Sequence, residues 1–278
     1  MSKIEKALNR AREGRGNLQV VPVATAGGVP SPGTAIVADS GAHPETIPRM
    51  AKNEVRLLSA ADLAQRGIIQ PQHSEDSAVQ VFRDLRTKII QQSHGKNAVI
   101  LVTSVSKRCG SSFIAQNLGA AFAFDMGKTA LLIDCNLRSP SVHKLLANAS
   151  APGLTDYFEN PGLDIEEIIL PVGIARYRVI TAGKRREVLE EHFTSEKMRH
   201  LMDTLRRRYQ ERFIIMDGPP MSNIADIRIL SDLADCVLVV ARYARSTNTQ
   251  IANCLDAISE KKRLGIIFNE EPRFPRIR

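Results

Sequence analysis

A run of small and hydroxyl-bearing residues marks the place where an apolar stretch gives way to a helical pattern. In VTSVSKRCGSSFIAQNLG (residues 102–119), Gly110 is followed by Ser111, Ser112 and apolar residues at helical spacing. Such a turn binds phosphate because glycine lets backbone N–H groups approach an anion, and the helix N-terminus adds a favourable dipole. A hydroxyl in the position of Ser112 can bind the accompanying metal ion, and a lysine usually precedes it. The sequence therefore predicts a phosphate-binding loop in which Ser111 replaces that lysine.

Two carboxylates follow apolar stretches further along the chain. Asp134 ends the run TALLID, and Asp217 ends the run RFIIMD. Because the carboxyl ends of parallel strands share one edge of a sheet, both side chains are expected beside the phosphate loop. Their oxygens could bind Mg²⁺ together with Ser112, and an active site of this kind would use them for phosphoryl transfer. We therefore predict that Gly110, Ser111 and Ser112 contact phosphate, with the two aspartates as the catalytic residues of any active site.

The elements that must position these side chains alternate along the chain. Continuous apolar runs, typical of buried strands, cover residues 98–104, 129–135, 177–183, 212–218, 236–243 and 264–270. Helical patterns cover residues 75–92, 195–209 and 247–259. Alternating strands and helices of this kind indicate a mainly parallel sheet with helices on both faces. We therefore predict a doubly wound α/β fold of the P-loop NTPase type.

The chain is predicted to have three parts. Residues 1–14 form an amphipathic helix, residues 15–53 a flexible linker rich in Gly, Pro and Ala, and residues 54–278 the α/β domain, with its core at about 75–270. A helix of about a dozen residues is only marginally stable alone in water. The apolar side of residues 2–13 is therefore expected to bind a partner surface.

The composition argues against several classes of protein. The net charge is +8, but only 5% of the residues are aromatic, which leaves little for base stacking and argues against nucleic acid as a partner. The four cysteines lack the paired spacing of a zinc site, and the histidines form no HExxH pair. No apolar run approaches the about 20 residues of a membrane-spanning helix, so we expect a cytoplasmic protein.

Four segments, taken in order, resemble the motifs of one family. They are TSVSKRCGSSFIAQNLG, LLIDCNLRSPSVH, GLTDYF and IIMDGPP. Together they are similar to the bacterial tyrosine kinases, the cytoplasmic P-loop modules of capsule and exopolysaccharide chain-length control, which are relatives of the ParA and MinD ATPases. The resemblance covers about residues 54–270 and implies a protein-tyrosine kinase that uses ATP and Mg²⁺. It also implies that Asn269 lies near the nucleotide base, and the alternative role for this residue is to cap the end of its strand.

The resemblance extends to partners. VFRDLRTKI is similar to the family's subunit-contact helix, which implies a homo-oligomer in which Arg83 and Arg86 contact a neighbouring subunit. The start of the chain, SKIEKAL, resembles members that act beside a separate membrane co-polymerase. The implied partner is a membrane polysaccharide co-polymerase or export complex, bound through residues 2–13. The protein would then lie at the inner face of the membrane through that partner.

The chain also departs from the family pattern. Ser111 replaces the loop lysine, Arg108 a glycine, Cys109 a glutamate, and Asn136 the second acidic residue after Asp134. The missing lysine removes a charge-assisted contact worth about 1.5–3 kcal/mol. Asn136 cannot supply carboxylate charge to Mg²⁺. We therefore expect binding of ATP or ADP and Mg²⁺ to be weak or lost, and the protein to be a catalytically impaired regulatory partner.

Two alternative functions stay open. Lys107 could reach phosphate across a dimer, as an additional lysine does in ParA-like ATPases, and the chain would then be an active ATP-dependent tyrosine autokinase. It could also be a positioning ATPase like ParA or MinD, whose basic clusters bind DNA or lipid. The segment KKRLGIIFNEEPRFPRIR contains no tyrosine, which predicts no autophosphorylation on that segment.

Overall fold

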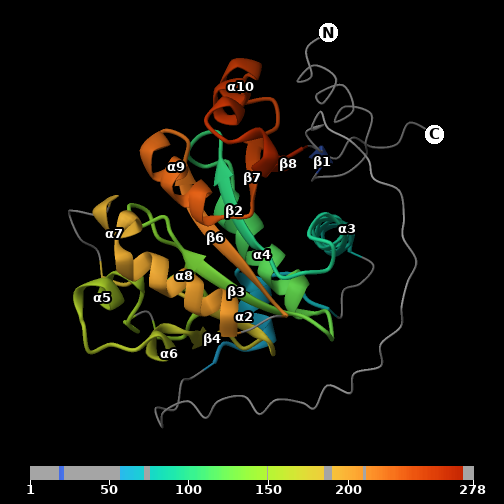
Figure 1. Ribbon diagram of the computed structural model, residues 1–278. Helices are drawn as coiled ribbons and strands as arrows, with labels where there is room; N and C mark the ends of the chain where they lie inside the picture. The colour runs from blue at the N-terminus through green and yellow to red at the C-terminus, as the bar shows by residue number, and fades with distance from the viewer. Residues whose placement is uncertain are drawn as a thin grey trace, which may run out of the picture.

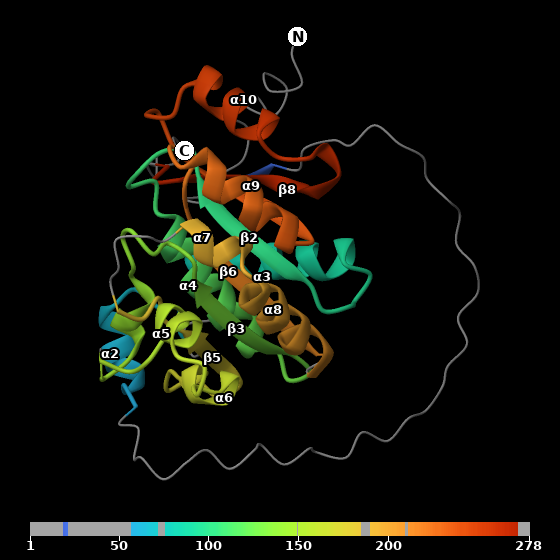
Figure 2. The same ribbon diagram turned by 60° about the vertical axis from the view of Figure 1, so that its left-hand side comes forward.

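The sheet contains eight strands among the residues that the computed structural model describes, in the order β1-β8-β7-β2-β6-β3-β5-β4 (Figures 1 and 2). The described residues are 19–21, 57–71, 76–148, 150–184, 190–208 and 211–271. The strands are β1 (Gln19–Val21), β2 (Val99–Ser104), β3 (Thr129–Asp134), β4 (Leu170–Pro171), β5 (Tyr177–Ile180), β6 (Arg212–Pro220), β7 (Cys236–Arg242) and β8 (Arg263–Asn269). The six strands from β8 to β5 pair in parallel, and β1 and β4 add antiparallel edges.

Helices cover both faces of the sheet. They are α2 (Ala60–Gln65), α3 (Ser77–Gln92), α4 (Ser111–Ala123), α5 (Leu154–Glu159), α6 (Ile165–Ile168), α7 (Glu190–Thr194), α8 (Glu196–Arg208), α9 (Ile224–Leu233) and α10 (Asn248–Asp256), with short 3-10 turns η1 (Val142–Leu145) and η2 (Glu260–Lys262). Helices α2, α3 and α4 contribute to the core on one face, and α5 to α10 contribute to the core on the other. The predicted doubly wound α/β fold is therefore confirmed.

Each buried strand contributes side chains to the hydrophobic cores on both faces of the sheet, because successive residues point to opposite faces. On β2, Val99 and Leu101 pack on one face while Ile100 and Val102 pack on the other. Successive side chains of a strand point to opposite faces, so a strand covered on both sides must be apolar throughout. This is why the buried strands were recognisable as continuous apolar runs.

Two short elements differ from the predicted organisation. Strand β1 lies inside residues 15–53, which were predicted to be linker throughout, and it pairs antiparallel with β8. Without β1, the edge of β8 would present unpaired backbone groups, and the valines of β1 favour an extended strand. The predicted helix over residues 1–14 and the rest of the linker lie outside the described residues.

Helix α2 was not predicted. Its N-cap is Ser59, whose side chain accepts a bond from the Asp62 N–H at 3.1 Å while the Asp62 carboxylate accepts from the Ser59 N–H at 3.0 Å. This reciprocal cap stabilises a helix of only six residues.

Among the described residues, no helix has the length and apolar character needed to cross a bilayer.

Candidate functional site

The loop between β2 and α4 turns at Gly110, the N-cap of α4, which has a left-handed φ of 88°. A Cβ atom at this position would lie 2.1 Å from Nδ2 of Asn269, so the turn requires glycine for space as well as for conformation. Asn269 ends β8, and its Nδ2 donates to the carbonyl of Cys109 at 3.0 Å. The structure therefore places Asn269 behind the loop as a support, and its proximity to a nucleotide base stays a prediction.

The two serines of the loop have different neighbours. Ser111, in the place of the expected lysine, is only 8% exposed, and its hydroxyl lies 3.5 Å from the Ser104 hydroxyl at the end of β2. It turns toward the strand and carries no positive charge. The Ser112 hydroxyl lies close enough to the carboxylate of Asp217 to lower the pKa of that group. Ser112 thus connects the phosphate loop to the acidic half of the site.

The cations of the loop lie on the surface. Lys107 and Arg108 are both exposed, and Lys107 makes no hydrogen bond or ion pair with any described residue. Arg108 has a φ of 63°, a left-handed conformation that favours glycine. Its backbone therefore keeps the turn that a glycine would make, at a conformational cost. The neighbouring Cys109 is buried, with its sulfur 3.3 Å from the Ser106 hydroxyl.

Asp134, at the end of β3, lies opposite Asp217 on β6, and both are fully buried. Oδ2 of Asp134 accepts from the N–H groups of Ser141 and Val142, each at 2.9 Å, and Oδ1 accepts from the Asn136 N–H at 3.2 Å. Oδ2 of Asp217 accepts from the Ser141 hydroxyl at 3.5 Å. Oδ1 of Asp217 is buried and has no hydrogen-bond partner among the described residues. The predicted meeting of the two carboxylates at one edge is therefore what the structure shows.

Burial changes the titration of this pair. It raises the pKa of Asp134 from 3.8 to about 6, although three backbone N–H groups oppose the shift. Burial and the charge of Asp134 raise the pKa of Asp217 well above its usual value, while hydrogen bonds from Ser112 and Ser141 lower it. Two buried carboxylates at close range cannot both ionise easily. The pair therefore holds its protons more tightly than two free carboxyl groups would.

The oxygen atoms at this edge fit a hard cation such as Mg²⁺. Oδ1 of Asp217 is a buried, unpartnered carboxylate oxygen beside a second carboxylate and the hydroxyl of Ser112. Mg²⁺ typically takes one or two carboxylates and completes its shell with water and phosphate oxygens. Within the described part of the chain, no group of three or more His, Cys, Asp or Glu side chains could hold a metal. A cation here would therefore need the serine and an incoming phosphate as well as the two aspartates.

A polar chain that the sequence did not reveal lies behind the carboxylates. Nε2 of Gln116 on α4 donates to the Ser141 hydroxyl at 3.2 Å, and the Tyr177 hydroxyl donates to the main-chain carbonyl of Gln116 at 2.9 Å. Tyr177 is completely buried and packs where α4 has Gly119, at which a Cβ atom would come within 2.5 Å of the ring. The only available signal was the position of Ser141 in the loop after β3.

The residues predicted to contact another subunit lie on α3. Nη1 of Arg86 donates to the carbonyl of Ala121 at 3.0 Å and lies 3.9 Å from the Asp125 carboxylate. Arg86 therefore binds the C-terminal end of α4 in its own chain, where a cation is favourable. Arg83 is half-buried on the same helix. A role for either residue in a subunit interface stays a prediction.

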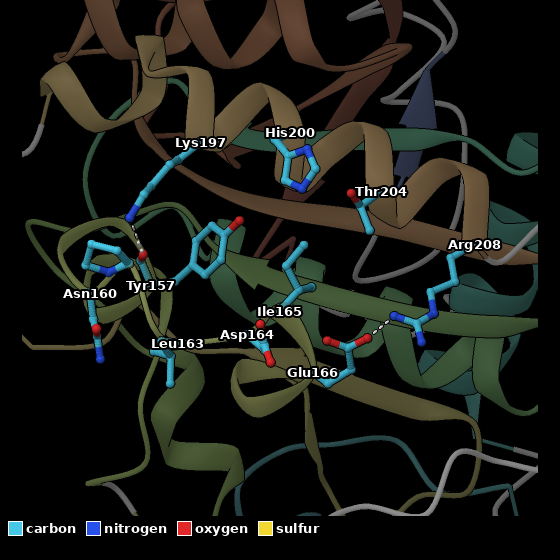
Figure 3. A pocket seen from close by; sticks show the side chains of 11 residues that line it. Tyr157, Asn160, Leu163, Asp164, Ile165, Glu166, Lys197, His200, Thr204 and Arg208 are labelled. Atoms are coloured by element: carbon cyan, nitrogen blue, oxygen red, sulfur yellow. Dashed lines mark hydrogen bonds and ion pairs between the residues drawn. The ribbon is translucent and has the colours of Figure 1, made fainter.

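A hollow of about 230 Å³ lies between α8 and residues 157–166, away from the carboxylates (Figure 3). An ion pair between Arg208 and Glu166 closes one end. At the other end, Lys197 donates to the carbonyls of Tyr157 and Phe158 at 3.3 and 2.9 Å. None of the residues predicted for the site lines this hollow.

Sequence comparison finds several kinases with a similar segment, although no family model matches the chain. The tyrosine-protein kinase wzc of Salmonella typhimurium is 30% identical over 197 residues, which is 70% of this chain and 27% of that protein. The tyrosine-protein kinase ptk of Acinetobacter johnsonii is 28% identical over 231 residues, covering 82% and 31%. A putative tyrosine-protein kinase in the cps region of Klebsiella pneumoniae is 24% identical over 197 residues, covering 70% and 27%. The chain thus spans about three tenths of the length of these relatives.

Solved structures share the architecture over most of their length. The chimerical protein CapA2B2 superposes with a TM-score of 0.67 at 25% identity, covering 78% of this chain and 95% of that chain. The kinase domain of the Escherichia coli tyrosine kinase ETK superposes with a TM-score of 0.65 at 24% identity, covering 77% and 87%. Motif order, sequence identity and fold agree, and the chain belongs to the bacterial tyrosine-kinase family, whose kinase-domain fold its described residues adopt.

Proposed function

We propose that this chain is a regulatory member of its family in capsule or exopolysaccharide biosynthesis, with weak binding of Mg²⁺ and nucleotide and impaired phosphoryl transfer. One observation carries the proposal. The two buried carboxylates and the Ser112 hydroxyl stand ready for a cation, while Ser111 occupies the lysine position and turns toward Ser104. The site therefore keeps groups that bind and lacks the cation that stabilises charge on the transferred phosphate.

Different residues of the site would bind the phosphate and the Mg²⁺ ion. Backbone N–H groups at Gly110 and the start of α4 would contact phosphate, and Ser112, Asp134 and Asp217 would hold Mg²⁺. When bound, Mg²⁺ supplies positive charge to the phosphate oxygens. Asn136 is bonded to Asp134 only through its backbone N–H, and its amide adds no charge to the site. Loss of one preorganised group that stabilises developing charge costs about 100-fold to 1,000-fold in rate.

The proposed partner is a membrane polysaccharide co-polymerase or export complex, reached through residues 2–13 at the inner face of the membrane. The similarity of SKIEKAL to family members that act beside such a protein supports this assignment. The name of the Klebsiella relative, which places it in a cps region, supports the link to capsule. The protein would act by nucleotide occupancy and self-association rather than by turnover.

The test compares the wild type with Ser111→Lys, using Ser111→Ala as the control for loss of the serine itself. Calorimetry with ATP and ADP, with and without Mg²⁺, measures binding, and phosphate release and labelled phosphate on tyrosine measure turnover. We expect measurable Mg²⁺-dependent binding in the wild type. Turnover should increase about 100-fold in Ser111→Lys only. A wild type that turns over ATP as fast as Ser111→Lys would refute the proposed impairment.

An active kinase is the second candidate, and Lys107 is the observation that favours it. This side chain is exposed and makes no ion pair or hydrogen bond with the described residues, so its ammonium group is available to phosphate. In that case wild-type turnover would be substantial and would depend on Lys107 as well as on Asp134 and Asp217.

A further inference from the structure

Ser141 contacts both carboxylates of the site. Its backbone N–H donates to Oδ2 of Asp134 at 2.9 Å, and its hydroxyl lies 3.5 Å from Oδ2 of Asp217. These two bonds come from one half-buried residue at the point where the loop after β3 returns to the sheet. Ser141 therefore connects the end of β3 to the end of β6.

The direction of the Ser141 hydroxyl is set by its other neighbour. Nε2 of Gln116 donates to this hydroxyl at 3.2 Å. A hydroxyl has one proton to donate and two lone pairs to accept with, so the proton of Ser141 is left for Asp217. The backbone of α4 at Gln116 is in turn held by the buried Tyr177 hydroxyl, which donates to the main-chain carbonyl of Gln116 at 2.9 Å. The result is an amide-to-hydroxyl-to-carboxylate chain that ends on Asp217.

This chain decides which oxygen of Asp217 is available. Ser141 bonds to Oδ2, whereas Oδ1 is buried and without a partner in the described structure. Ser112 also lies close enough to Asp217 to lower its pKa, but Ser112 is itself an expected cation ligand and would have to turn toward the cation. Ser141 is then the donor that keeps Asp217 in place.

We propose that Ser141 is a positioning residue for the cation site, whose hydroxyl fixes Asp217 so that Oδ1 can bind Mg²⁺. This inference rests on the proposed function, since it assigns a role toward the same cation. Groups of this kind, which hold a metal ligand without touching the metal, change metal affinity about 10-fold to 100-fold when removed.

The hydroxyl can be removed without dismantling the loop. The Ser141 side chain makes no capping bond to η1. The bonds from the N–H groups of Ser141 and Val142 to Asp134 are backbone bonds and remain in Ser141→Ala. Ser141→Thr keeps a hydroxyl on the same backbone. Ser139→Ala is a matched control, because Ser139 is an exposed serine of the same loop.

The experiment measures Mn²⁺ as a spectroscopic substitute for Mg²⁺. Electron paramagnetic resonance of free Mn²⁺ gives the affinity of each full-length variant with and without ADP, and calorimetry in EDTA gives the affinity for ADP alone. We expect Ser141→Ala to weaken Mn²⁺ binding about 10-fold while ADP affinity in EDTA stays within about twofold. Ser141→Thr should recover most of the Mn²⁺ affinity, and Ser139→Ala should match the wild type.

Two results would overturn the inference. If Ser141→Ala binds Mn²⁺ as the wild type does, or loses ADP equally in EDTA, the hydroxyl does not position a cation ligand. This first result leaves the proposed function intact, because the wild type still binds. If the wild type binds Mn²⁺ neither alone nor with ADP, the cation site of the proposed function is refuted together with this inference.

Discussion

The two halves of the site, the phosphate loop and the carboxylate pair, are built differently. In the loop, Lys107 and Arg108 are exposed and the residue at the lysine position is a neutral serine. In the carboxylate pair, Asp134 and Asp217 are fully buried and bonded to the loop after β3. Burying a carboxylate is unfavourable unless its oxygens find partners. The difference is that the charged groups of the loop lie on the surface, whereas the carboxylates are buried and held by hydrogen bonds from the chain.

The largest expected effect concerns the carboxylate pair and pH. The folded pKa of Asp134 is about 6, above the unfolded value of 3.8, so the unfolded chain loses this proton first as the pH rises. Stability that is fully present below about pH 4 should therefore fall by about 3 kcal/mol through pH 6, at about 1.4 kcal/mol per pKa unit. The raised pKa of Asp217 extends the fall to higher pH. Urea unfolding from pH 4 to 8 measures it.

Variants separate the two carboxylates in this measurement. Asp217→Asn should leave only the Asp134 part of the fall, between about pH 4 and 6, with a smaller slope there and no fall above it, since the amide side chain of this variant carries no titrating proton. Asp134→Asn together with Asp217→Asn should give a flatter profile, whereas Asp203→Asn on the exposed side of α8 should follow the wild type. If the free energy of unfolding of the double variant depends on pH as that of the wild type does, the two buried carboxylates do not cause the fall. The contrast with the loop would then disappear.

An intermediate effect is expected at the turn of the phosphate loop. Gly110→Ala should lower the free energy of unfolding by about 1–3 kcal/mol, because the site combines left-handed backbone with a contact to Asn269. Gly95→Ala is the matched control, since Gly95 has a φ of 75° and nothing within 4 Å of an added Cβ. Thermal or urea unfolding of both variants isolates the contribution of the contact.

The double variant Gly110→Ala/Asn269→Ala sharpens this point. If Asn269 supports the loop through direct contact, removing it should reduce the loss at Gly110 to that of Gly95→Ala. Losses that add independently would contradict the supporting role of Asn269 and return it to the role near a nucleotide base that the family resemblance implies.

The smallest effect is expected for Lys107→Ala. An exposed, solvated ammonium group is screened by salt, so nucleotide affinity should change by no more than about twofold at physiological ionic strength. Calorimetry with Mg²⁺ and ADP or ATP measures this, with Lys144→Ala as an exposed control in the loop after β3. A loss of tenfold or more that is specific to Lys107 would favour the active-kinase alternative and erase the difference between the two halves.

Much of the fold could be predicted because its signals are local. The six main strands are apolar throughout, and helix α3 begins where Asp76 accepts a bond from the Ala78 N–H at 3.0 Å. Strand β1 could not be predicted, because its three residues are a strand only through pairing with β8. The two aspartates were predictable because each ends an apolar run that is recognisable as a strand.

The rest of the site depends on contacts between distant parts of the chain. Gln116 reaches Ser141 from α4, and Tyr177 on β5 bonds to the main-chain carbonyl of Gln116; neither residue type at those positions suggests such contacts. Asn269 was predicted from family resemblance to lie near a nucleotide, but its contact with the Cys109 carbonyl depends on how β8 meets the loop. Arg86 likewise looked like an exposed interface residue, and its bond to the end of α4 is visible only in three dimensions.

The direction of β1 has a mechanical consequence. Gln19 pairs with Phe268, the residue before Asn269, and Val21 pairs with Ile266 further from that edge. The chain therefore enters β1 on the side of the sheet where the phosphate loop lies. Because the two strands are antiparallel, the start of β1 and the end of β8 lie at the same end of the pair, so a pull that separates these two ends would break their shared backbone bonds one after another. A pull from that end would reach the strand that carries Asn269 before it reached any other part of the sheet.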